Sequence, residues 1–371
     1  MSFLAVTEPP SSAPPASLLD RVGRIVSRDL APLVQRIDRE GHYPEAVLRE
    51  LGEAGAFAAH VGHEGAGMVD AIAAMARVGQ DCLATAFCMW CQDALAWYLA
   101  NSESDELKRA LLPGAASGRV LGGTGLSNPM KALARIEPLR LTATEVQDGF
   151  RLNGTLPWVS NLGPGHLFGT AFPVASDGRL AMALIDCSQP GVQVGENARF
   201  LALDGTRTWS VTFRDALVPR SMVLADPALP FIARIKAGFI LLQCGMALGL
   251  IRGCIDLMRR CDENGGETNR FLEDRPDTLA EELEALTAEV RLLCETPRET
   301  SDDYMRRVLQ VRLDSSEWSL RAAQAAMLHA GARGYLAGAP AQRRLRESYF
   351  VAIVTPATKH LRRELAALAG K

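Results

Sequence analysis

The chain has 371 residues, of which 48% are hydrophobic and 22% are charged, and its formal net charge is −3. This length is too great for one ordinary hydrophobic core and predicts two or three domains, each with an apolar interior. The composition excludes intrinsic disorder for most of the chain. Because 40 basic residues balance 43 acidic ones, it also excludes a broad charged surface for nucleic acid or for an anionic membrane.

The N-terminus and the cysteines favour a reduced, cytoplasmic protein. Residues 1–16 are rich in proline, serine and alanine, which predicts a flexible arm without a targeting pattern. The spacing of the eight cysteines is not that of a disulfide framework. Cys88 and Cys91 form a lone C-x-x-C in an apolar run. Zinc would need a second pair or suitably spaced histidines, so we expect core packing and no metal site.

The first third of the chain has helical spacing. Apolar residues recur every three or four positions over residues 17–39, and Ser17 with Asp20 can form an N-cap, which predicts one amphipathic helix there. Four further helices are expected over residues 43–55, 70–79, 84–101 and 103–112. Residues 17–115 are therefore predicted to be an N-terminal α-helical domain.

The pattern changes to short strands in residues 116–228. The candidate strands are separated by Gly, Asp, Asn and Pro, and no long helix lies between them, which disfavours a doubly wound parallel sheet. They lie at residues 139–144, 150–152, 166–173, 180–186 and 210–214. This segment is predicted to be a central antiparallel β-domain of the barrel or sandwich kind.

Helical spacing returns in residues 229–371. Four long helices are expected over residues 231–260, 279–293, 302–329 and 342–367, with short connections typical of a four-helix bundle. The most apolar stretch, residues 237–251, is shorter than the roughly 20 residues of a membrane span and predicts a buried core helix. The whole chain is thus expected to be α+β and mostly α.

The common short motifs of nucleotide, metal and hydrolase sites are missing. Gly123-Thr124-Gly125 is the nearest approach to a dinucleotide-binding turn, but it follows helices and has Asn128 where the third glycine belongs, which disfavours a Rossmann site. Four histidines are expected at loops or element edges as ordinary polar residues: His42, His60, His63 and His166.

The order of helical domain, β-domain and four-helix bundle resembles the acyl-CoA dehydrogenase superfamily, and motifs along most of the chain are similar to its signatures. Each motif alone is weak, but their order and spacing together are specific. They are Leu30-Ala31-Pro32 with the Ile37 to Pro44 segment, Leu152-Asn153-Gly154 followed by Trp158-Val159-Ser160-Asn161, Phe213-Arg214-Asp215 with Val218-Pro219, and Gly331-Ala332-Arg333-Gly334-Tyr335.

This resemblance implies a non-covalent FAD between the β-domain and the bundle, in a homo-oligomer, a dimer or tetramer, whose subunits share the flavin site. Trp158 would form a flat wall for the flavin ring, and Thr124 and Ser160 would supply hydrogen-bond donors. The alternative for Trp158 is a core residue at the rim of the β-domain. By the same resemblance, Ser127 or Asn128 would approach the pyrophosphate.

Other positions come from the same resemblance. Arg270 and Phe271 would reach the FAD of a partner subunit, although Leu272 replaces the usual glycine and a surface arginine near a turn is an equally good interpretation. Gly331, Gly334 and Thr358 would also belong to cofactor binding.

The catalytic base is the main departure from the family. Dehydrogenation needs a carboxylate to remove the proton α to the thioester carbonyl. Alignment of Arg346 and Glu347 with the family's R-D places Thr355 at the usual glutamate, and Phe239 falls where a smaller set of members has its carboxylate. Neither side chain is a base at neutral pH. The remaining candidates are Glu347 and His360.

Two histidines of the last third have competing interpretations. His360 has a side chain suited to proton transfer at neutral pH, but it is also expected to face solvent in a charged segment. His329 is expected to be structural.

Three functions are compatible with these observations. The first is an FAD-dependent oxidoreductase acting on the CH–CH bond of an acyl thioester such as an acyl-CoA. The second is a flavin-dependent monooxygenase or oxidase of the same fold acting on a small organic substrate, with His360 as acid or base. The third is a non-catalytic protein that binds flavin or acyl-CoA.

Overall fold

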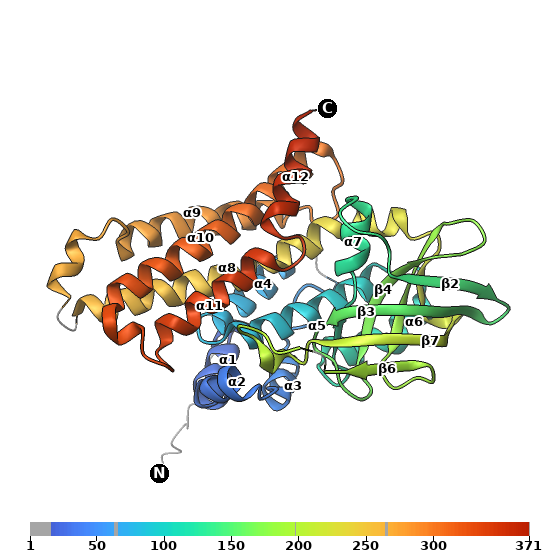
Figure 1. Cartoon of the computed structure of the whole chain (residues 1–371), viewed down its shortest axis with the longest axis horizontal. Helices are drawn as coiled ribbons and strands as arrows, with labels where there is room; N and C mark the ends of the chain where they lie inside the picture. Colours follow the sequence, from blue (N-terminus) through green and yellow to red (C-terminus); the bar gives the residue numbers. More distant parts are fainter. Residues whose placement is uncertain (1–15, 63–65, 197, 264–265, 371) are drawn as a thin grey trace, which may run out of the picture.

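The computed structural model describes residues 16–62, 66–196, 198–263 and 266–370. The flexible arm expected over residues 1–16 therefore lies, except for Ala16, outside the described residues, as does His63. The chain has the predicted order of an N-terminal helical domain, a central β-domain and a C-terminal helical bundle (Figure 1). The expected fold class is confirmed.

The first helix, α1 (Leu18–Ile25), begins at a capping box. The Ser17 hydroxyl accepts a hydrogen bond from the Asp20 amide while the Asp20 carboxylate accepts one from the Ser17 amide. The prediction of one regular helix over residues 17–39 is wrong in its middle. Pro32 has no N–H to donate, and the chain there passes through a π-helical turn and a 3₁₀ turn. These turns are η1 (Val26–Leu30) and η2 (Ala31–Leu33), followed by α2 (Val34–Glu40).

Helix α5 (Leu83–Asn101) is the centre of the molecule. Every residue from 83 to 99 is buried, and the helix packs against other helices and against the first strand. The Trp90 and Trp97 indoles donate hydrogen bonds to carbonyls of α8 (Leu229–Glu263). Its neighbours in the N-terminal domain are α3 (Glu45–Glu53), α4 (Ala66–Gly79) and α6 (Asp105–Ala116).

The β-domain consists of two four-stranded sheets packed face to face as a sandwich. One sheet has the order β1-β4-β5-β8 and the other β2-β3-β7-β6. The Phe150 and Phe172 rings, from different sheets, meet edge to face at 5.5 Å in their shared core. The strands are β1 (Gly122–Thr124), β2 (Leu141–Val146), β3 (Gly149–Val159), β4 (Leu167–Pro173), β5 (Leu180–Asp186), β6 (Val192–Gly195), β7 (Trp209–Pro219) and β8 (Val223–Ala225).

The expectation of a wholly antiparallel domain needs one correction, because β1 pairs with β4 in parallel. This pairing depends on close backbone approach. A Cβ atom on Gly122 would lie 1.8 Å from the Leu167 carbonyl oxygen, so only glycine fits at this position.

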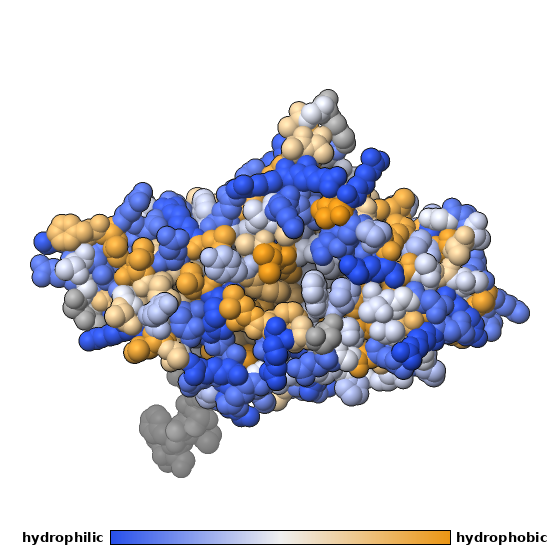
Figure 2. Space-filling view, viewed as in Figure 1, coloured by the Kyte–Doolittle hydropathy of each residue, from blue (hydrophilic) through white to orange (hydrophobic). Residues whose placement is uncertain are grey.

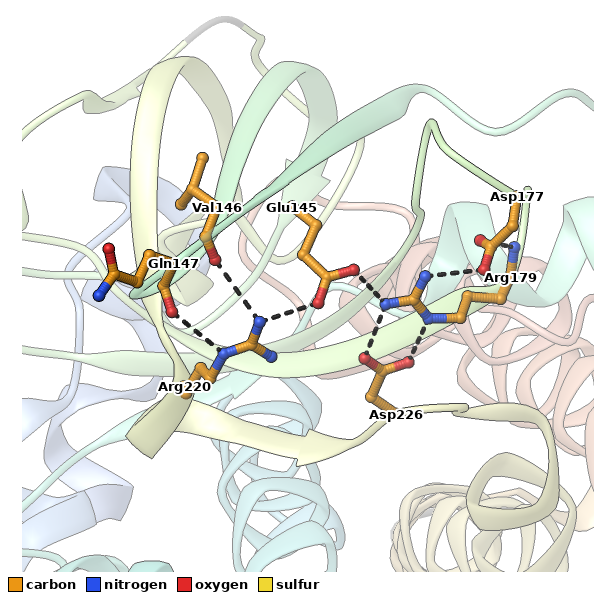
Figure 3. Close-up of polar contacts among 7 residues, drawn as sticks. All are labelled: Glu145, Val146, Gln147, Asp177, Arg179, Arg220 and Asp226. Atoms are coloured by element: carbon orange, nitrogen blue, oxygen red, sulfur yellow. Dashed lines mark hydrogen bonds and ion pairs between the residues drawn. The ribbon is translucent and has the colours of Figure 1, made fainter.

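A cluster of ion pairs joins the two sheets at the surface (Figure 3). Arg179, just before β5, pairs with Glu145 of β2 at 2.6 Å and with Asp226, just after β8, at 2.8 Å. Arg220 contacts the second oxygen of Glu145 at 2.8 Å. The hydrogen bond from Arg179 is the main reason that the pKa of Glu145 lies below its usual value.

The bundle differs from the predicted four helices at its C-terminal end. The single helix expected over residues 342–367 is two helices, α11 (Pro340–Ile353) and α12 (Thr358–Ala369). Pro356 explains the break, because the residue before a proline is disfavoured in the helical region and proline itself cannot donate. The break places Thr355 outside both helices. The other bundle helices are α8, α9 (Pro276–Leu293) and α10 (Asp302–Gly334).

Helix α8 is long and apolar enough to cross a membrane by length and composition, but 94% of its most apolar window is buried inside the protein. It therefore occupies the place expected of a core helix.

The prediction that His60 is an ordinary polar residue at an element edge is wrong, because it is buried beside Asp93 of α5. The His60 Nε2 atom lies 3.0 Å from the Asp93 carbonyl oxygen, and its Nδ1 atom lies 3.7 Å from the Asp93 carboxyl. Within the described part of the chain, both carboxyl oxygens lack a hydrogen-bond partner. Burial raises the pKa of Asp93 well above its usual 3.8 and lowers the pKa of His60 to about 4. His60 is therefore neutral at pH 7, and burial favours the protonated form of the Asp93 carboxyl.

We predict that Asp93→Asn stabilises the protein increasingly as the pH rises. The folded chain keeps Asp93 protonated above pH 3.8 while the unfolded chain releases the proton, so wild-type stability is lost with rising pH. The gain of the variant should grow as the pH rises above 3.8, by at most about 1.4 kcal/mol per pH unit. Urea denaturation at several pH values measures it. The exposed Asp70→Asn should show no such growth, and a flat difference for Asp93→Asn would mean that Asp93 is ionised in the fold.

Candidate functional site

A cavity of about 330 Å³ lies between the β-domain and the helices. The molecular surface is hollowed where these two parts meet, and apolar side chains gather around the hollow (Figure 2). Six residues singled out in the sequence line the cavity together: Thr124, Ser127, Trp158, Ser160, Phe239 and Thr355.

These residues reach the cavity from five separate parts of the fold. Thr124 ends β1, Ser127 begins α7 (Ser127–Leu133), and Trp158 lies near the end of β3, just before Ser160. The bundle supplies the remaining two from α8 and from the break between α11 and α12. The cavity therefore exists only when the β-domain and the bundle are packed together.

Hydroxyl pairs form the polar part of the lining. Thr124 Oγ1 lies 2.7 Å from the Tyr98 hydroxyl, and Ser160 Oγ lies 2.7 Å from Thr208 Oγ1. Ser127 Oγ lies 2.8 Å from Thr355 Oγ1, which links the β-domain side to the bundle. Each hydroxyl can donate or accept, so this surface can bind oxygen and nitrogen atoms of a ligand.

The apolar part of the lining is aromatic. The Trp158 side chain is not a core residue, since Trp158 is 54% exposed beside the cavity. On the helical side lie Phe87, Trp90, Phe239 and Phe350, whose rings contact one another. Cys91 lines the cavity too, and burial holds its pKa well above the usual value, so it remains a thiol.

The two positions that the family uses for its base meet in this one cavity. Thr355 and Phe239 both line it, and among the lining residues that the structure describes none is Asp, Glu or His. Lys131 is the charged residue of that set, and its Nζ atom lies 3.9 Å from Glu137. The arrangement can bind a flat apolar ring and hold an oxygen by hydrogen bonds, but it does not offer a carboxylate for proton removal.

Glu347 is buried away from this lining. Its Oε1 atom accepts a hydrogen bond from Arg343 at 2.7 Å, one helical turn earlier in α11. The ion pair with Arg343 explains why a carboxylate is buried at this position. Glu347 is not among the residues that line the cavity.

The expectation that His360 faces solvent is wrong. Its side chain is buried, and its Nε2 atom lies 2.7 Å from Glu364 Oε1. Lys236 contacts the other oxygen of Glu364 at 2.6 Å. Lys236 and Glu364 line a second cavity, of about 260 Å³, which shares Phe239 with the first. Sequence reasoning missed Glu364, although its spacing of four from His360 in a helix was a usable signal.

The remaining candidates lie elsewhere in the bundle. Phe271 is 77% exposed in η5 (Glu267–Phe271), with the Arg270 guanidinium 4.8 Å above its ring. The neighbouring Asn269 donates to the His329 carbonyl at 3.2 Å, so this turn lies beside the C-terminal part of α10. Gly331 and Gly334 follow there, and Gly331 has the non-helical φ of 55°.

Three polar side chains near these sites serve the fold. Asn128 bonds with Glu137, Pro138 and Arg140 through its whole amide. Thr358 donates to the Ala352 carbonyl at 3.0 Å across the helix break. As expected, His329 is structural, with ring nitrogens 2.9 Å from Asp262 and from the Asp274 carbonyl.

Comparison with known proteins agrees with this geometry. The family model "Acyl-CoA dehydrogenase, N-terminal domain" matches residues 16–119. The mitochondrial short-chain specific acyl-CoA dehydrogenase of Homo sapiens is 25% identical over 358 residues, which cover 89% of this chain and 84% of that protein. Residues 16–119 thus match the N-terminal domain of this family, and the chain is similar to an acyl-CoA dehydrogenase over most of its length.

Solved structures of the superfamily superpose over nearly the whole chain. Butyryl-CoA dehydrogenase from Megasphaera elsdenii has a TM-score of 0.84 at 18% identity, covering 95% of this chain and 97% of that one. The prolyl acyl carrier protein oxidase AnaB has a TM-score of 0.81 at 17% identity, covering 95% and 98%. The fold is therefore shared by a dehydrogenase and an oxidase.

We predict that Glu364→Gln lowers the free energy of unfolding by roughly 2–3 kcal/mol at neutral pH. Burial opposes ionisation of Glu364, but its contacts with His360 and Lys236 outweigh burial and lower its pKa from 4.5 to about 2. That stability is present above pH 4.5 and is lost as the pH falls towards 2.

Urea denaturation at neutral and acidic pH measures this loss. Glu284→Gln removes a more exposed ion pair with Arg252 and should cost less than about 1 kcal/mol. Equal losses for the two variants would contradict the assignment of a strong buried interaction to Glu364.

Proposed function

We propose that this protein is an FAD-dependent oxidoreductase that acts on the CH–CH bond of an acyl thioester. The observation that carries the proposal is the single cavity in which Trp158 and the Thr124 and Ser160 hydroxyls lie with Phe239 and Thr355. The match of residues 16–119 to the family's N-terminal domain supports it, as do the relatives named as acyl-CoA dehydrogenases.

The residues present fit a flavin. A flavin ring needs a flat apolar surface and a few hydrogen-bonding groups, and the exposed Trp158 indole lies beside paired hydroxyls in the cavity. Bound FAD would supply a two-electron acceptor. Trp158 would cover its ring, Thr124 and Ser160 would bind its polar edge, and Ser127 would approach the pyrophosphate, as the family resemblance implies.

The chain's own residues would bind and orient the substrate. The buried rings of Phe87, Trp90 and Phe239 exclude water from the helical side of the cavity. The Thr355 hydroxyl would donate a hydrogen bond to the thioester carbonyl, which makes its α proton more acidic. This contact would polarise the substrate but would not accept the proton, and the base for that step is not among the described lining residues.

We also propose that the protein works in the cytoplasm as a homo-oligomer. Arg270, Phe271, Gly331 and Gly334 lie outside the cavity lining, and Phe271 is exposed. A second copy would bring this region to its own cavity, as the family resemblance implies.

We predict that the purified protein carries FAD and that Trp158→Ala weakens FAD binding about tenfold or more, because the ring loses its aromatic contact. Titration of the apoprotein with FAD, followed by flavin fluorescence, measures this. Leu292→Ala removes a side chain of similar exposure in α9 and should leave the affinity unchanged. Wild-type protein that does not take up FAD would contradict the proposed function.

A second function, an oxidase or monooxygenase reaction with oxygen, is favoured by one observation. Among the described lining residues none is a carboxylate, whereas CH–CH dehydrogenation depends on proton removal. The fold of AnaB shows that this scaffold accommodates an oxidase. Anaerobic mixing of the flavoprotein with acyl-CoAs separates the two, because bleaching of the flavin indicates dehydrogenation. No bleaching, followed by consumption of an organic substrate when oxygen meets reduced flavin, indicates the oxygenase.

We predict that Thr355→Glu accelerates anaerobic flavin reduction by an acyl-CoA by roughly 10²–10⁴-fold, because it places a carboxylate in the cavity where the wild type has a hydroxyl. Stopped-flow absorbance gives the rate. Thr355→Gln has nearly the same size without a base and should give no acceleration. The absence of acceleration in the Glu variant, with FAD bound, would show that residue 355 does not face the substrate's α carbon.

A further inference from the structure

We propose that the aromatic wall of the cavity selects substrates whose reacting end carries a flat, uncharged aromatic ring. The aromatic wall consists of Phe87 and Trp90 from α5, Phe239 from α8 and Phe350 from α11. This inference deepens the proposed function and rests on it, since it assigns Trp158 to the flavin and the aromatic wall to the substrate.

The rings of the aromatic wall form one continuous set of contacts. Phe87 stacks on Trp90 with ring centroids 5.6 Å apart and meets Phe350 edge to face at 4.5 Å. Trp90 meets Phe239 edge to face at 5.0 Å. The three helices thus present faces and edges of rings to the same cavity, which is the surface that another aromatic ring packs against best.

Hydrogen bonds hold the aromatic wall in place. The Trp90 indole donates to the Phe239 carbonyl at 3.3 Å, which links α5 to α8. Tyr98 stacks against Phe239 at 6.2 Å, and its hydroxyl pairs with Thr124 on the polar side of the cavity. Because closely packed side chains resist rotamer changes, the aromatic wall keeps its shape. It therefore does not adapt easily to a flexible alkyl chain of a substrate.

The charges around the cavity disfavour a negatively charged reacting end. Lys131 is the charged residue among the described lining residues, its side chain is 26% exposed, and it lies near Glu137. A carboxylate placed against the aromatic wall would lose its hydration without an opposite charge in that wall. A neutral ring loses little hydration and gains edge-to-face contacts.

The preference has a measurable size. An aromatic pair contributes beyond the area that it buries, by an amount equal to about two- to tenfold in affinity per contact. A ring that meets two members of the aromatic wall should therefore bind about four- to a hundredfold more tightly than an alkyl chain of equal carbon number. If the aromatic wall only packed the core, the two ligands would bind alike.

The experiment uses the FAD-loaded protein and three acyl-CoAs of equal acyl carbon number: 3-phenylpropanoyl-CoA, 3-cyclohexylpropanoyl-CoA and nonanoyl-CoA. Dissociation constants come from the change in flavin absorbance under anaerobic conditions, and from tryptophan fluorescence. We expect the phenyl ligand to bind at least about fourfold more tightly than nonanoyl-CoA, with the cyclohexyl ligand weaker than the phenyl one. The primary amides of the same three acids are measured in the same way. Because they lack the thioester, a ring preference that persists among them does not come from recognition of the thioester.

The variant Phe239→Leu removes one ring of the aromatic wall and should reduce the preference by about two- to tenfold. Phe231→Leu is the matched control, because Phe231 is also buried in α8 but does not line the cavity. It should keep the wild-type preference. Thermal melting and FAD uptake establish whether both variants fold. If Phe239→Leu does not fold, the comparison of the three acyl-CoAs on the wild-type protein still tests the aromatic preference.

The outcomes distinguish this inference from the function on which it rests. Equal or tighter binding of nonanoyl-CoA by protein that holds FAD overturns the aromatic preference and leaves the proposed function standing. Failure to take up FAD overturns the proposed function itself. Retention of the ring preference in Phe239→Leu, together with its loss in Phe231→Leu, would also overturn the assignment to the aromatic wall.

Discussion

The structure depends on the complete burial of α5. The polar side chains of such a covered helix, the Asp93 carboxyl aside, pair with neighbouring elements, and those pairs fix the neighbours. Gln92 donates to the carbonyls of Ala115 and Val120 and accepts from the Gly122 amide, which attaches β1. Trp90 and Trp97 bond to α8 in the same way. One helix therefore sets the distance between the β-domain and the bundle.

The character of the cavity follows from this arrangement. The face of α5 towards the cavity carries Phe87, Trp90 and Cys91, so the helical side is apolar. The polar groups come from chain segments that end or turn where the β-domain meets the helices. There Thr124 pairs with Tyr98 and Ser127 pairs with Thr355, and these hydroxyls can also bind a ligand. A surface that is aromatic on one side and hydroxyl-lined on the other suits a neutral ring system with polar edges, and it offers no general base.

The sequence predicted the order of domains and most helices, because apolar periodicity reports which face is buried. It did not predict the interruptions. Pro32 and Pro356 each lie in a run whose apolar spacing continues past them. The prediction followed that spacing and placed one continuous helix across each proline. The short strand β1 was missed, because its three residues carry no alternating pattern and its pairing partner is distant in sequence.

The same distinction applies to the site. The motifs that resemble the superfamily brought together Trp158, Ser160, Phe239 and Thr355, which one cavity indeed unites. Pairings between distant residues were beyond sequence reasoning: the burial of His360 against Glu364 and of His60 against Asp93 depends on which helices pack together. The expected positions of these histidines failed for that reason, since a charged or polar neighbourhood in sequence says little about burial in space.

The most direct test of this account is an experimental structure of the protein with FAD bound. The account predicts that the flavin ring lies against Trp158 in the cavity, with Thr355 and Phe239 beside its reactive face and without a carboxylate within hydrogen-bonding reach of the substrate position. A ring bound elsewhere, or an Asp or Glu side chain pointing at that position, would contradict it.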